Sequence, residues 1–250
     1  MDPAYAAAYS DLAAHHWWWR ARESLLVDEI EKLRLGKPPG RILDVGCGDG
    51  RLFPSLERFG EVQGIEPDPA TLGTTAPAGR RIHHAPFEAP LPVTGKFDLI
   101  LMLDVLEHLD DPVASLALAR SLLSPDGILL LTVPALPALW TRHDELNHHR
   151  VRYTRAELRR QLVRAGLVPR MLRFEFHTLA LVKLFVRVAE VIRSGKPRLP
   201  QLPHPAVNRV VGGFFRIEAR VARPVAKWLP GSSLLALASL PAHGNNFPPI

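Results

Sequence analysis

Three glycines between a predicted strand and a predicted helix form the most informative pattern in this chain. Residues 42–50 read ILDVGCGDG, with glycine at positions 46, 48 and 50. Glycine lets a backbone turn tightly and lie close to a ligand where a side chain would clash. The dinucleotide fingerprint would need Gly or Ala where Arg51 stands, and the Gly-Lys-Ser/Thr of a phosphate loop is missing. We therefore expect this loop to hold a ligand other than a pyrophosphate.

Two carboxylates flank this loop at positions suited to a nucleoside. Glu66 ends the next predicted strand, 20 residues after Gly46, where it can accept hydrogen bonds from both hydroxyls of a ribose. Asp44 lies just before the loop and can hold a cationic amine or fix the loop itself.

Imidazoles follow two later strands. His108 comes after the predicted strand 97–103, at the edge where sites of open α/β sheets form. An imidazole pKa of about 6.5 suits a base at neutral pH, although His108 could equally cap the next helix or bond Glu107. The segment HDELNHH, residues 143–149, could contact an acceptor, supply a second base, or pair with neighbouring arginines. A metal site is an alternative, because His143, His148 and His149 with Asp144 could offer ligands. Their spacing matches no named zinc pattern, so we predict no metal site.

Residues 15–20, HHWWWR, place three indole rings in a row. On a helix these rings span about 200°, so they cannot all face one core. We expect at least one ring to face a ligand or a partner element, although two of them could be ordinary core residues.

Apolar runs alternate with amphipathic segments along the chain, which predicts an α/β fold with a doubly wound parallel sheet. Strands are expected at 41–45, 62–65, 81–84, 97–103, 128–133, 168–176 and 232–240. Helices are expected within 4–35 and at 52–59, 111–123, 154–165, 178–193 and 206–228.

Four motifs in order carry a resemblance to a known family. The run LDVGCGDG, 43–50, resembles the first motif of class I S-adenosylmethionine-dependent methyltransferases, and GIEP, 64–67, resembles their ribose-binding strand end. FDLI through DVLEHL, 97–109, and SPDG, 124–127, match the later motifs. The resemblance covers about residues 12–176 and the last strand. Residues 15–20 and 143–149 resemble a bacterial small-molecule subgroup, and the overall pattern is similar to quinone-pathway methyltransferases.

The resemblance implies a Rossmann-like, seven-stranded, mostly parallel sheet, with S-adenosyl-L-methionine as cofactor. It implies four segments within one domain: an N-terminal helical lid, the cofactor-binding core, a helical insertion or cap, and the last strand with its tail. These segments are predicted at 1–36, 37–176, 177–230 and 231–250, respectively.

The resemblance also implies roles for individual residues. Pro86 stands where many relatives place an Asp for the adenine amine, so adenine recognition is expected to rest on the Phe87 backbone N–H or on water. His108 is the predicted catalytic base or acceptor-orienting group. The predicted acceptor contacts are His143, His148, His149 and Tyr153. The predicted cofactor contacts are Asp44, Gly46, Cys47, Gly48, Glu66, Pro67, Phe87, Asp104, Trp19 and Arg20.

Basic residues are concentrated in the second half of the chain. Residues 1–140 hold 12 Lys/Arg and 19 Asp/Glu, a net charge of −7, whereas residues 141–228 hold 19 and 6, a net charge of +13. In the predicted helix 206–228, arginines share one face and apolar residues the opposite face. Residues 178–228 could therefore contact an anionic membrane surface, or they could cover a substrate with a solvated basic face.

These observations predict methyl transfer from S-adenosylmethionine to the oxygen or nitrogen of a small acceptor, hydrophobic or lipid-linked. The alternative is a non-catalytic module that binds the cofactor or a membrane surface. Nucleic-acid methylation is disfavoured because no RNA or DNA module is present, and a nicotinamide oxidoreductase is disfavoured by Arg51. With one cysteine, no signal peptide and no long apolar run, we expect a cytoplasmic protein, free or peripheral to a membrane.

Overall fold

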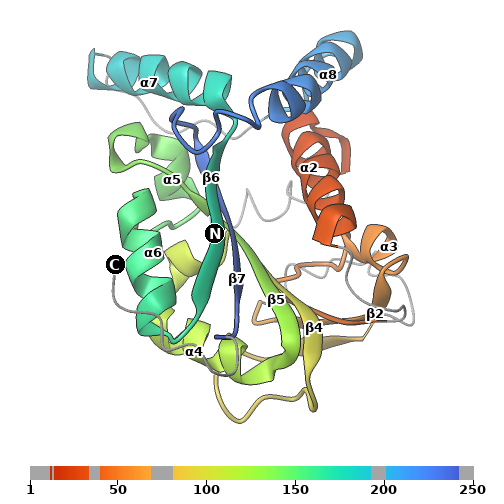
Figure 1. Cartoon of the computed structure of the whole chain (residues 1–250). Coiled ribbons are helices and arrows are strands. Elements are labelled where there is room, and N and C mark those ends of the chain that lie inside the picture. The colour runs from red at the N-terminus through yellow and green to blue at the C-terminus, as the bar shows by residue number, and fades with distance from the viewer. Residues whose placement is uncertain (1–11, 13, 34–39, 69–80, 193–200, 242–250) are drawn as a thin grey trace.

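The computed structural model describes residues 12, 14–33, 40–68, 81–192 and 201–241. Its centre is a seven-stranded sheet in the order β3-β2-β1-β4-β5-β7-β6, in which β7 alone runs antiparallel to its neighbours (Figure 1). The strands are β1 (Gly40–Val45), β2 (Gly60–Glu66), β3 (Ile82–His84), β4 (Phe97–Leu103), β5 (Leu123–Pro134), β6 (Val168–Glu175) and β7 (Ser233–Ser239). The predicted α/β fold with a seven-stranded, mostly parallel sheet is thus confirmed.

Helices cover both faces of this sheet and its upper end (Figure 1). The α-helices are α2 (Trp17–Leu33), α3 (Phe53–Leu56), α4 (Pro112–Leu122), α5 (Arg142–Leu146), α6 (Arg155–Arg164), α7 (His177–Ile192) and α8 (Pro205–Val221). Two short 3-10 helices, η2 (Leu106–His108) and η3 (Pro137–Leu139), follow β4 and β5. Within the described ranges, no helix has both the length and the apolar content needed to cross a bilayer.

The continuous apolar sequence of β4 is explained by burial on both sides of the sheet. Ile100 and Met102 pack into one core cluster, whereas Leu99 and Leu101 pack into the other. Helices α4 and α6 contribute to the first cluster, and α2 and α3 to the second. A strand enclosed in this way has no polar face, which is why its residues do not alternate.

Several element boundaries differ from the sequence prediction. Helix α3 is one turn, and β5 begins at Leu123 because residues 124–127 are accommodated by a register shift against β4. Helix α8 ends at Val221 rather than 228, since Pro224 lies just beyond and its ring cannot continue a helix. The predicted helical residues 4–11 lie outside the described part of the chain.

The insertion between β6 and β7 determines what lies above the sheet. Because β6 runs parallel to β1–β5 and leads directly into α7, α7 and α8 lie at the carboxyl end of the parallel strands (Figure 1). Helix α8 packs on α2, where the Trp17 and Phe215 rings stack with centroids 4.7 Å apart. Ligands of open α/β sheets bind at this end.

Candidate active site

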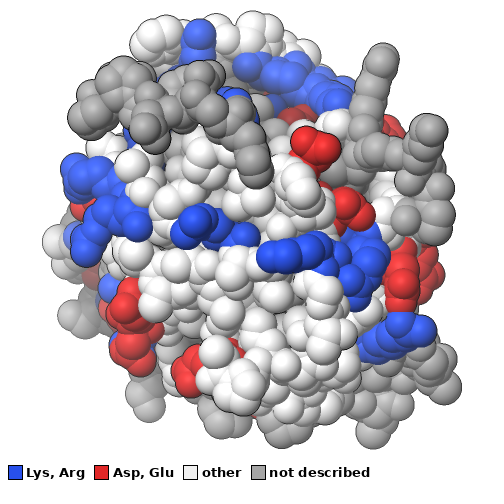
Figure 2. Space-filling view, turned by 60° about the horizontal axis from the view of Figure 1, so that its bottom comes forward, with Lys and Arg blue, Asp and Glu red and all other residues white. Residues whose placement is uncertain are grey.

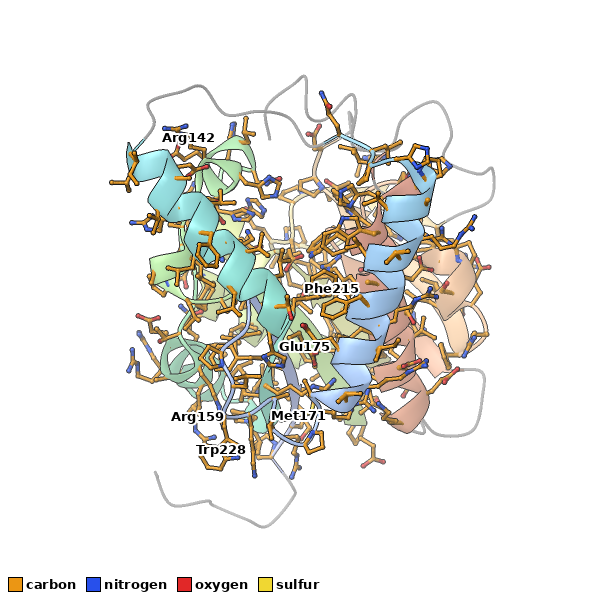
Figure 3. All side chains as sticks on the ribbon, turned by 90° about the horizontal axis from the view of Figure 1, so that it is seen from above. Arg142, Arg159, Met171, Glu175, Phe215 and Trp228 are labelled. Carbon is orange, nitrogen blue, oxygen red and sulfur yellow. The ribbon has the colours of Figure 1, made fainter. Side chains whose placement is uncertain are left out.

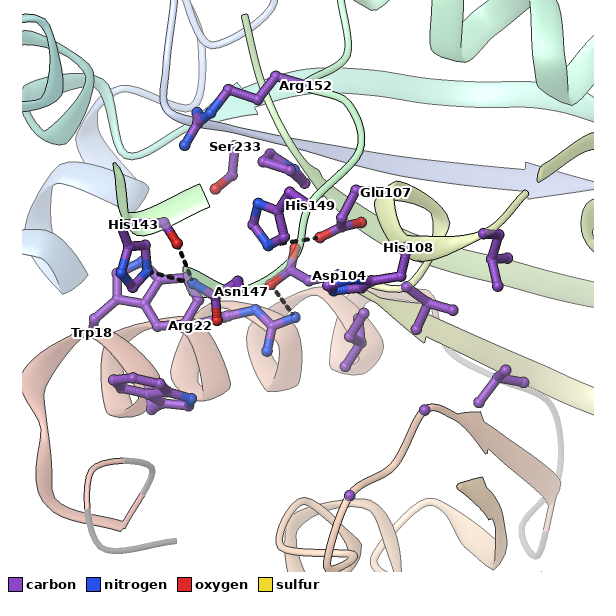
Figure 4. A pocket seen from close by; sticks show the side chains of 18 of the residues that line it. Trp18, Arg22, Asp104, Glu107, His108, His143, Asn147, His149, Arg152 and Ser233 are labelled. Atoms are coloured by element: carbon purple, nitrogen blue, oxygen red, sulfur yellow. Dashed lines mark hydrogen bonds and ion pairs between the residues drawn. The ribbon is translucent and has the colours of Figure 1, made fainter. Parts of the chain in front are cut away.

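A cavity of about 540 Å³ lies at the carboxyl ends of the central strands, beneath α7 and beside α2 (Figure 4). Its size is within the range of small-molecule sites. It joins the loop after β1 to the segments that follow β4 and β5. The residues that line it are His16, Trp17, Trp18, Trp19, Arg22, Val45, Gly46, Gly48, Ile65, Glu66, Pro67, Asp68, Phe87, Leu103, Asp104, Val105, Glu107, His108, Leu109, Pro134, His143, Asn147, His149, Arg152, Leu179, Lys183, Ser232 and Ser233.

The glycine loop presents bare backbone to one end of the cavity. Gly46 and Gly48 have φ angles of +70° and +57°, a region that favours glycine. A Cβ at Gly46 would lie 2.7 Å from a methyl group of Val105, whereas a Cβ at Gly48 would meet no atom within 4 Å. Gly46 is therefore required by packing, and Gly48 leaves space that a ligand can occupy.

Glu66 borders the same space and is held in place by the backbone. One carboxylate oxygen accepts from the Gly48 N–H at 2.8 Å, and the other accepts from the Asp68 N–H at 3.0 Å. A carboxylate offers about four acceptor positions, so it can also receive two hydroxyl groups. With Ile65, Pro67 and Phe87 supplying apolar contact, this end of the cavity fits a ribose and an adenine.

Three predicted cofactor contacts lie outside the cavity lining. Asp44 is buried behind the loop, where burial raises its pKa to about 7 against the opposing effect of Arg22. The Cys47 side chain packs on Phe53 in the core, and burial raises its thiol pKa. Arg20 is exposed because it lies on the outer side of α2, although its neighbour Trp19 lines the cavity.

Arg22, which the sequence prediction missed, connects α2 to the ends of β4 and β5. It pairs with Asp104 at 2.8 Å and donates to the Thr132 hydroxyl at 3.1 Å (Figure 4). The Thr132 hydroxyl donates in turn to Asp104 at 3.0 Å. The guanidinium also lies 5.4 Å from the Trp18 ring centroid. The sequence feature that could have identified Arg22 as a site residue is its position one helical turn after Trp18.

All three indole rings of the HHWWWR segment contribute to the cavity wall. Trp17 is also stacked on Phe215 of α8, and Trp18 and Trp19 meet edge to face with centroids 5.0 Å apart. Consecutive residues on one helix can share a cavity because α8 covers the side of α2 that would otherwise face water. The rings make this wall apolar and aromatic.

At the opposite end, a buried carboxylate holds an imidazole in a defined orientation. Asp144 accepts from His149 Nδ1 at 2.9 Å and from two Arg152 nitrogens at 2.9 and 2.8 Å. It also accepts from Thr141 N–H as part of a capping box. Burial acts to raise the Asp144 pKa, but the His149 bond and the charges of Lys183 and Arg152 outweigh it and hold the pKa below its usual range. An ionised Asp144 places the ring proton on Nδ1 and leaves Nε2 as an acceptor.

Glu107 and His108 complete this polar end of the cavity (Figure 4). Glu107 is fully buried, and neither of its carboxyl oxygens has a hydrogen-bond partner among the described residues. Burial and the charge of Asp104 raise its pKa well above the ordinary value, which favours a neutral carboxyl group. His149 Nε2 lies 3.9 Å from Glu107, and the His108 and His149 ring centroids are 5.0 Å apart.

The same three side chains are a donor set that could hold a metal ion. One candidate ligand atom from each of Glu107, His108 and His149 lies within 4.8 Å of the other two. Carboxylate and imidazole are common ligands of zinc and other divalent metals. The sequence prediction contained no metal site, and the alternative that it weighed used His143, His148 and His149 with Asp144 instead.

Two predicted acceptor residues are in the cavity wall and two are not. His143 lines the cavity beside Asn147, whose amide lies 3.1 Å from the His143 ring, and burial lowers the His143 pKa to about 4. His148 is exposed, because a φ of +55° directs the chain away from the cavity before His149. Tyr153 is buried in the core and donates to the Leu106 carbonyl, so it supports η2 from behind.

Lys183 of α7 is another lining residue that the sequence prediction did not include. It lies on the polar seam of a helix that is otherwise apolar, and burial lowers its pKa to about 8. The sequence signal for Lys183 was the presence of charged residues on an otherwise apolar helix. Which way these side chains face depends on how α7 packs on the rest of the protein.

Comparison with known proteins supports the same family. A family model described as a methyltransferase domain matches residues 18–170. The chain is 34% identical over 141 residues to a ubiquinone biosynthesis O-methyltransferase of Aromatoleum aromaticum, covering 50% of this chain and 60% of the relative. It is 30% identical over 149 residues to one from Pseudomonas aeruginosa, covering 53% and 63%. The chain thus spans about three fifths of the length of these curated relatives.

Solved structures show the same fold at low identity. A TehB-like S-adenosylmethionine-dependent methyltransferase from Corynebacterium glutamicum gives a TM-score of 0.54 at 18% identity, covering 96% of this chain and 100% of that one. A complex of a Haloferax volcanii methyltransferase with the Trm112 activator gives 0.59 at 19% identity and 97% coverage of each chain. The family model over residues 18–170, together with this fold, the glycine loop and Glu66, shows that the chain belongs to the class I S-adenosylmethionine-dependent methyltransferases.

Proposed function

We propose that this protein transfers a methyl group from S-adenosylmethionine to a hydroxyl oxygen of a small acceptor that is hydrophobic or lipid-linked. The observation that carries this proposal is a single cavity with a nucleoside-type loop at one end and a carboxylate-oriented imidazole at the other. The curated relatives are named as O-methyltransferases of ubiquinone biosynthesis, and this supports an aromatic hydroxyl as the acceptor.

The donor end uses backbone and carboxylate groups to hold the cofactor. Glu66 would bind the ribose hydroxyls, Phe87 and Pro67 would contact the adenine, and Gly48 would leave room for the chain of the methionine. The bound sulfonium supplies an electrophilic methyl group. Asp104, fixed by Arg22, would face the methionine ammonium from the end of β4.

The acceptor end supplies a base, and the geometry favours His149 over the predicted His108. Because Asp144 fixes the Nδ1 proton of His149, Nε2 can accept the hydroxyl proton as the oxygen attacks the methyl carbon. Electrons of the breaking carbon–sulfur bond stay on sulfur. Burial and the neighbouring His149 lower the His108 pKa to about 4, so His108 is a weaker base and is better suited to orienting the acceptor.

An oxygen acceptor explains the polar end better than a neutral amine does. A hydroxyl has to lose its proton as the new bond forms, whereas an amine already carries a nucleophilic lone pair. A neutral Glu107 could also donate a hydrogen bond to the acceptor, since burial raises its pKa.

The deciding experiment is a methyl-transfer assay with isotopically labelled S-adenosylmethionine. The acceptors are catechols with and without an isoprenoid tail, and the matching aminophenols. We expect labelled methyl on a ring oxygen, with greater turnover for the tailed catechol. Exclusive labelling of nitrogen would contradict the O-methylation proposal. Binding of S-adenosylhomocysteine without transfer to any acceptor would support the non-catalytic alternative.

A further inference from the structure

Helix α7 has its polar side turned toward the protein and its apolar side turned outward. Lys183 lines the cavity, Arg187 donates to the Trp140 carbonyl, and Glu190 accepts from the Arg142 N–H at 3.1 Å. The outward side carries only apolar residues, among them Phe185 and Val191 with 76% and 79% of their surface exposed. A helix on the surface of a protein in water normally has the opposite arrangement.

Helix α8 shows the same exposure of apolar residues. Its buried side, with Gly212 and Phe215, packs on α2. A second stripe at helical spacing faces outward and is apolar: Val207, Val210, Phe214, Ile217 and Val221. The apolar stripe that the sequence analysis recognised therefore does not pack into the core.

These outward residues lie on the two helices at the top of the molecule, and we call them together the α7–α8 apolar face. Seen from above, α7 and α8 lie across the top of the molecule on opposite sides (Figure 3). Soluble monomers rarely expose so many large apolar side chains together, so such a face indicates a partner. Its members are Leu181, Val182, Leu184, Phe185, Val186, Val188, Val191 and Ile192 of α7, and Val207, Val210, Phe214, Ile217 and Val221 of α8.

The charges beside this face indicate the chemistry of the partner. The exposed charged residues of α8 are Arg209, Arg216 and Arg220, and exposed Lys227 follows the helix. Of these, Arg220 also pairs with Asp28 of α2 at 3.4 Å. The two acidic residues of these helices are engaged, because Glu190 accepts from Arg142 and Glu218 accepts from the Thr178 N–H. By contrast, the face seen when the bottom of the molecule is brought forward shows side chains of both signs (Figure 2).

We propose that the α7–α8 apolar face docks on an anionic lipid bilayer. Its apolar side chains would lie among the acyl chains near the headgroups, while the arginines of α8 would contact lipid phosphates. A symmetric dimer through this face would bring like-charged arginine rows close together, which is unfavourable. Since α7 also lines the cavity with Leu179 and Lys183, a bilayer here would lie next to the proposed acceptor site.

The test is flotation of the full chain with vesicles of phosphatidylcholine and phosphatidylglycerol in equal parts, and with vesicles of phosphatidylcholine alone. We expect binding to the mixed vesicles that weakens as salt is raised, because salt screens the arginine–lipid attraction. Phe185→Glu combined with Val191→Glu should reduce binding by ~10-fold or more, since apolar area is lost. Arg209→Gln and Arg216→Gln should each reduce it by roughly five-fold.

The matched control is Val163→Glu on α6, an apolar residue with 55% of its surface exposed outside this face. It should bind vesicles as the unchanged chain does. Thermal unfolding and S-adenosylhomocysteine binding, both independent of lipid, establish that each variant is folded. Absence of binding to mixed vesicles, or equal binding by the Phe185/Val191 variant, would overturn the proposal. Sedimentation showing a dimer broken by those substitutions, without lipid binding, would assign this face to a second copy.

Discussion

The two ends of the cavity are built from different materials. The proposed cofactor end is built around the backbone of the loop after β1, which is held by the Ile65 carbonyl and by Glu66. The acceptor end is made of side chains from η2, α5 and α7, with Asp144 at its centre. A backbone site depends on where glycine is tolerated, whereas a side-chain site depends on how distant elements pack.

Burial shifts pKa values at both ends of the cavity, upward for carboxyl groups and downward for imidazoles. Near the cofactor end, burial raises the pKa of Asp44 to about 7. At the acceptor end, burial lowers the pKa values of His108 and His143 to about 4. Each group is thus pushed toward its neutral form, because a charge is costly without water. We therefore expect substitutions at the two ends to change different quantities, which are ligand binding, catalysis and the pH dependence of stability.

The largest expected effect separates catalysis from cofactor binding. His149→Ala removes the proposed base, so kcat should fall by ~10²- to 10⁴-fold. The dissociation constant of S-adenosylhomocysteine should not change, because this residue lies at the other end of the cavity. Steady-state rates with the acceptor found above, and calorimetric titration, measure the two quantities. His108→Gln should reduce kcat less; if it reduces kcat more than His149→Ala does, the assignment of the base is reversed.

A smaller effect is expected from the cofactor end. Glu66→Ala removes the acceptor of the ribose hydroxyls and releases the Gly48 N–H, so S-adenosylhomocysteine should bind ~100-fold more weakly. Glu66→Gln keeps one oxygen acceptor and should lose only ~10-fold. Both values come from calorimetric titration, with thermal unfolding as the check on folding. Unchanged affinity in the Ala variant would show that Glu66 only braces the loop.

A third difference between the two ends concerns the pH dependence of stability. The folded-state pKa of Asp44 is about 7, above its ordinary 3.8, so this group's contribution to stability is lost as pH rises between those values. The folded-state pKa of His108 is about 4, below its ordinary 6.5, so its contribution is lost as pH falls between them. At about 1.36 kcal/mol per pKa unit, the Asp44 shift corresponds to roughly 4 kcal/mol, because this group is buried. The His108 side chain is exposed, and solvent screening reduces its contribution to roughly 1–2 kcal/mol.

Urea unfolding at pH 4.0, 5.5 and 7.0, chosen as roughly evenly spaced points across both windows, measures these contributions. Relative to the unchanged chain, Asp44→Asn should gain stability as pH rises, and His108→Gln should gain it as pH falls. Equal pH profiles of unfolding free energy for both variants and the unchanged chain would contradict the pKa shifts of Asp44 and His108.

Much of the fold follows from local sequence. The buried strand 97–103 is predicted with its observed bounds, because only apolar residues can be enclosed on both faces. The capping box of Thr154 and Glu157 marks the start of α6 correctly. The start of β5 is not predictable in this way, because its register against β4 rather than local preference sets it.

The sequence predicts those parts of the candidate site whose residues lie close together in the chain. Gly46, Gly48 and Glu66 are found together because a loop and one strand end contain them all. Arg22 and Lys183 are missed because they reach the cavity from elements more than 100 residues apart in the chain. Tyr153 and His148 are adjacent to true lining residues, yet one is in the core and the other is exposed.

The sequence by itself determined the family, the sheet and the nucleoside-type loop, because each of these depends on residues that are close together in the chain. Only the tertiary structure decided that His149 rather than His108 is held by a carboxylate, since the chain turns back after α5, with a φ of +55° at His148, and brings His149 to Asp144. It also decided that the apolar stripes of α7 and α8 face outward. An amphipathic sequence shows that a helix has an apolar side and a polar side, but only the neighbours of the helix determine which side is covered.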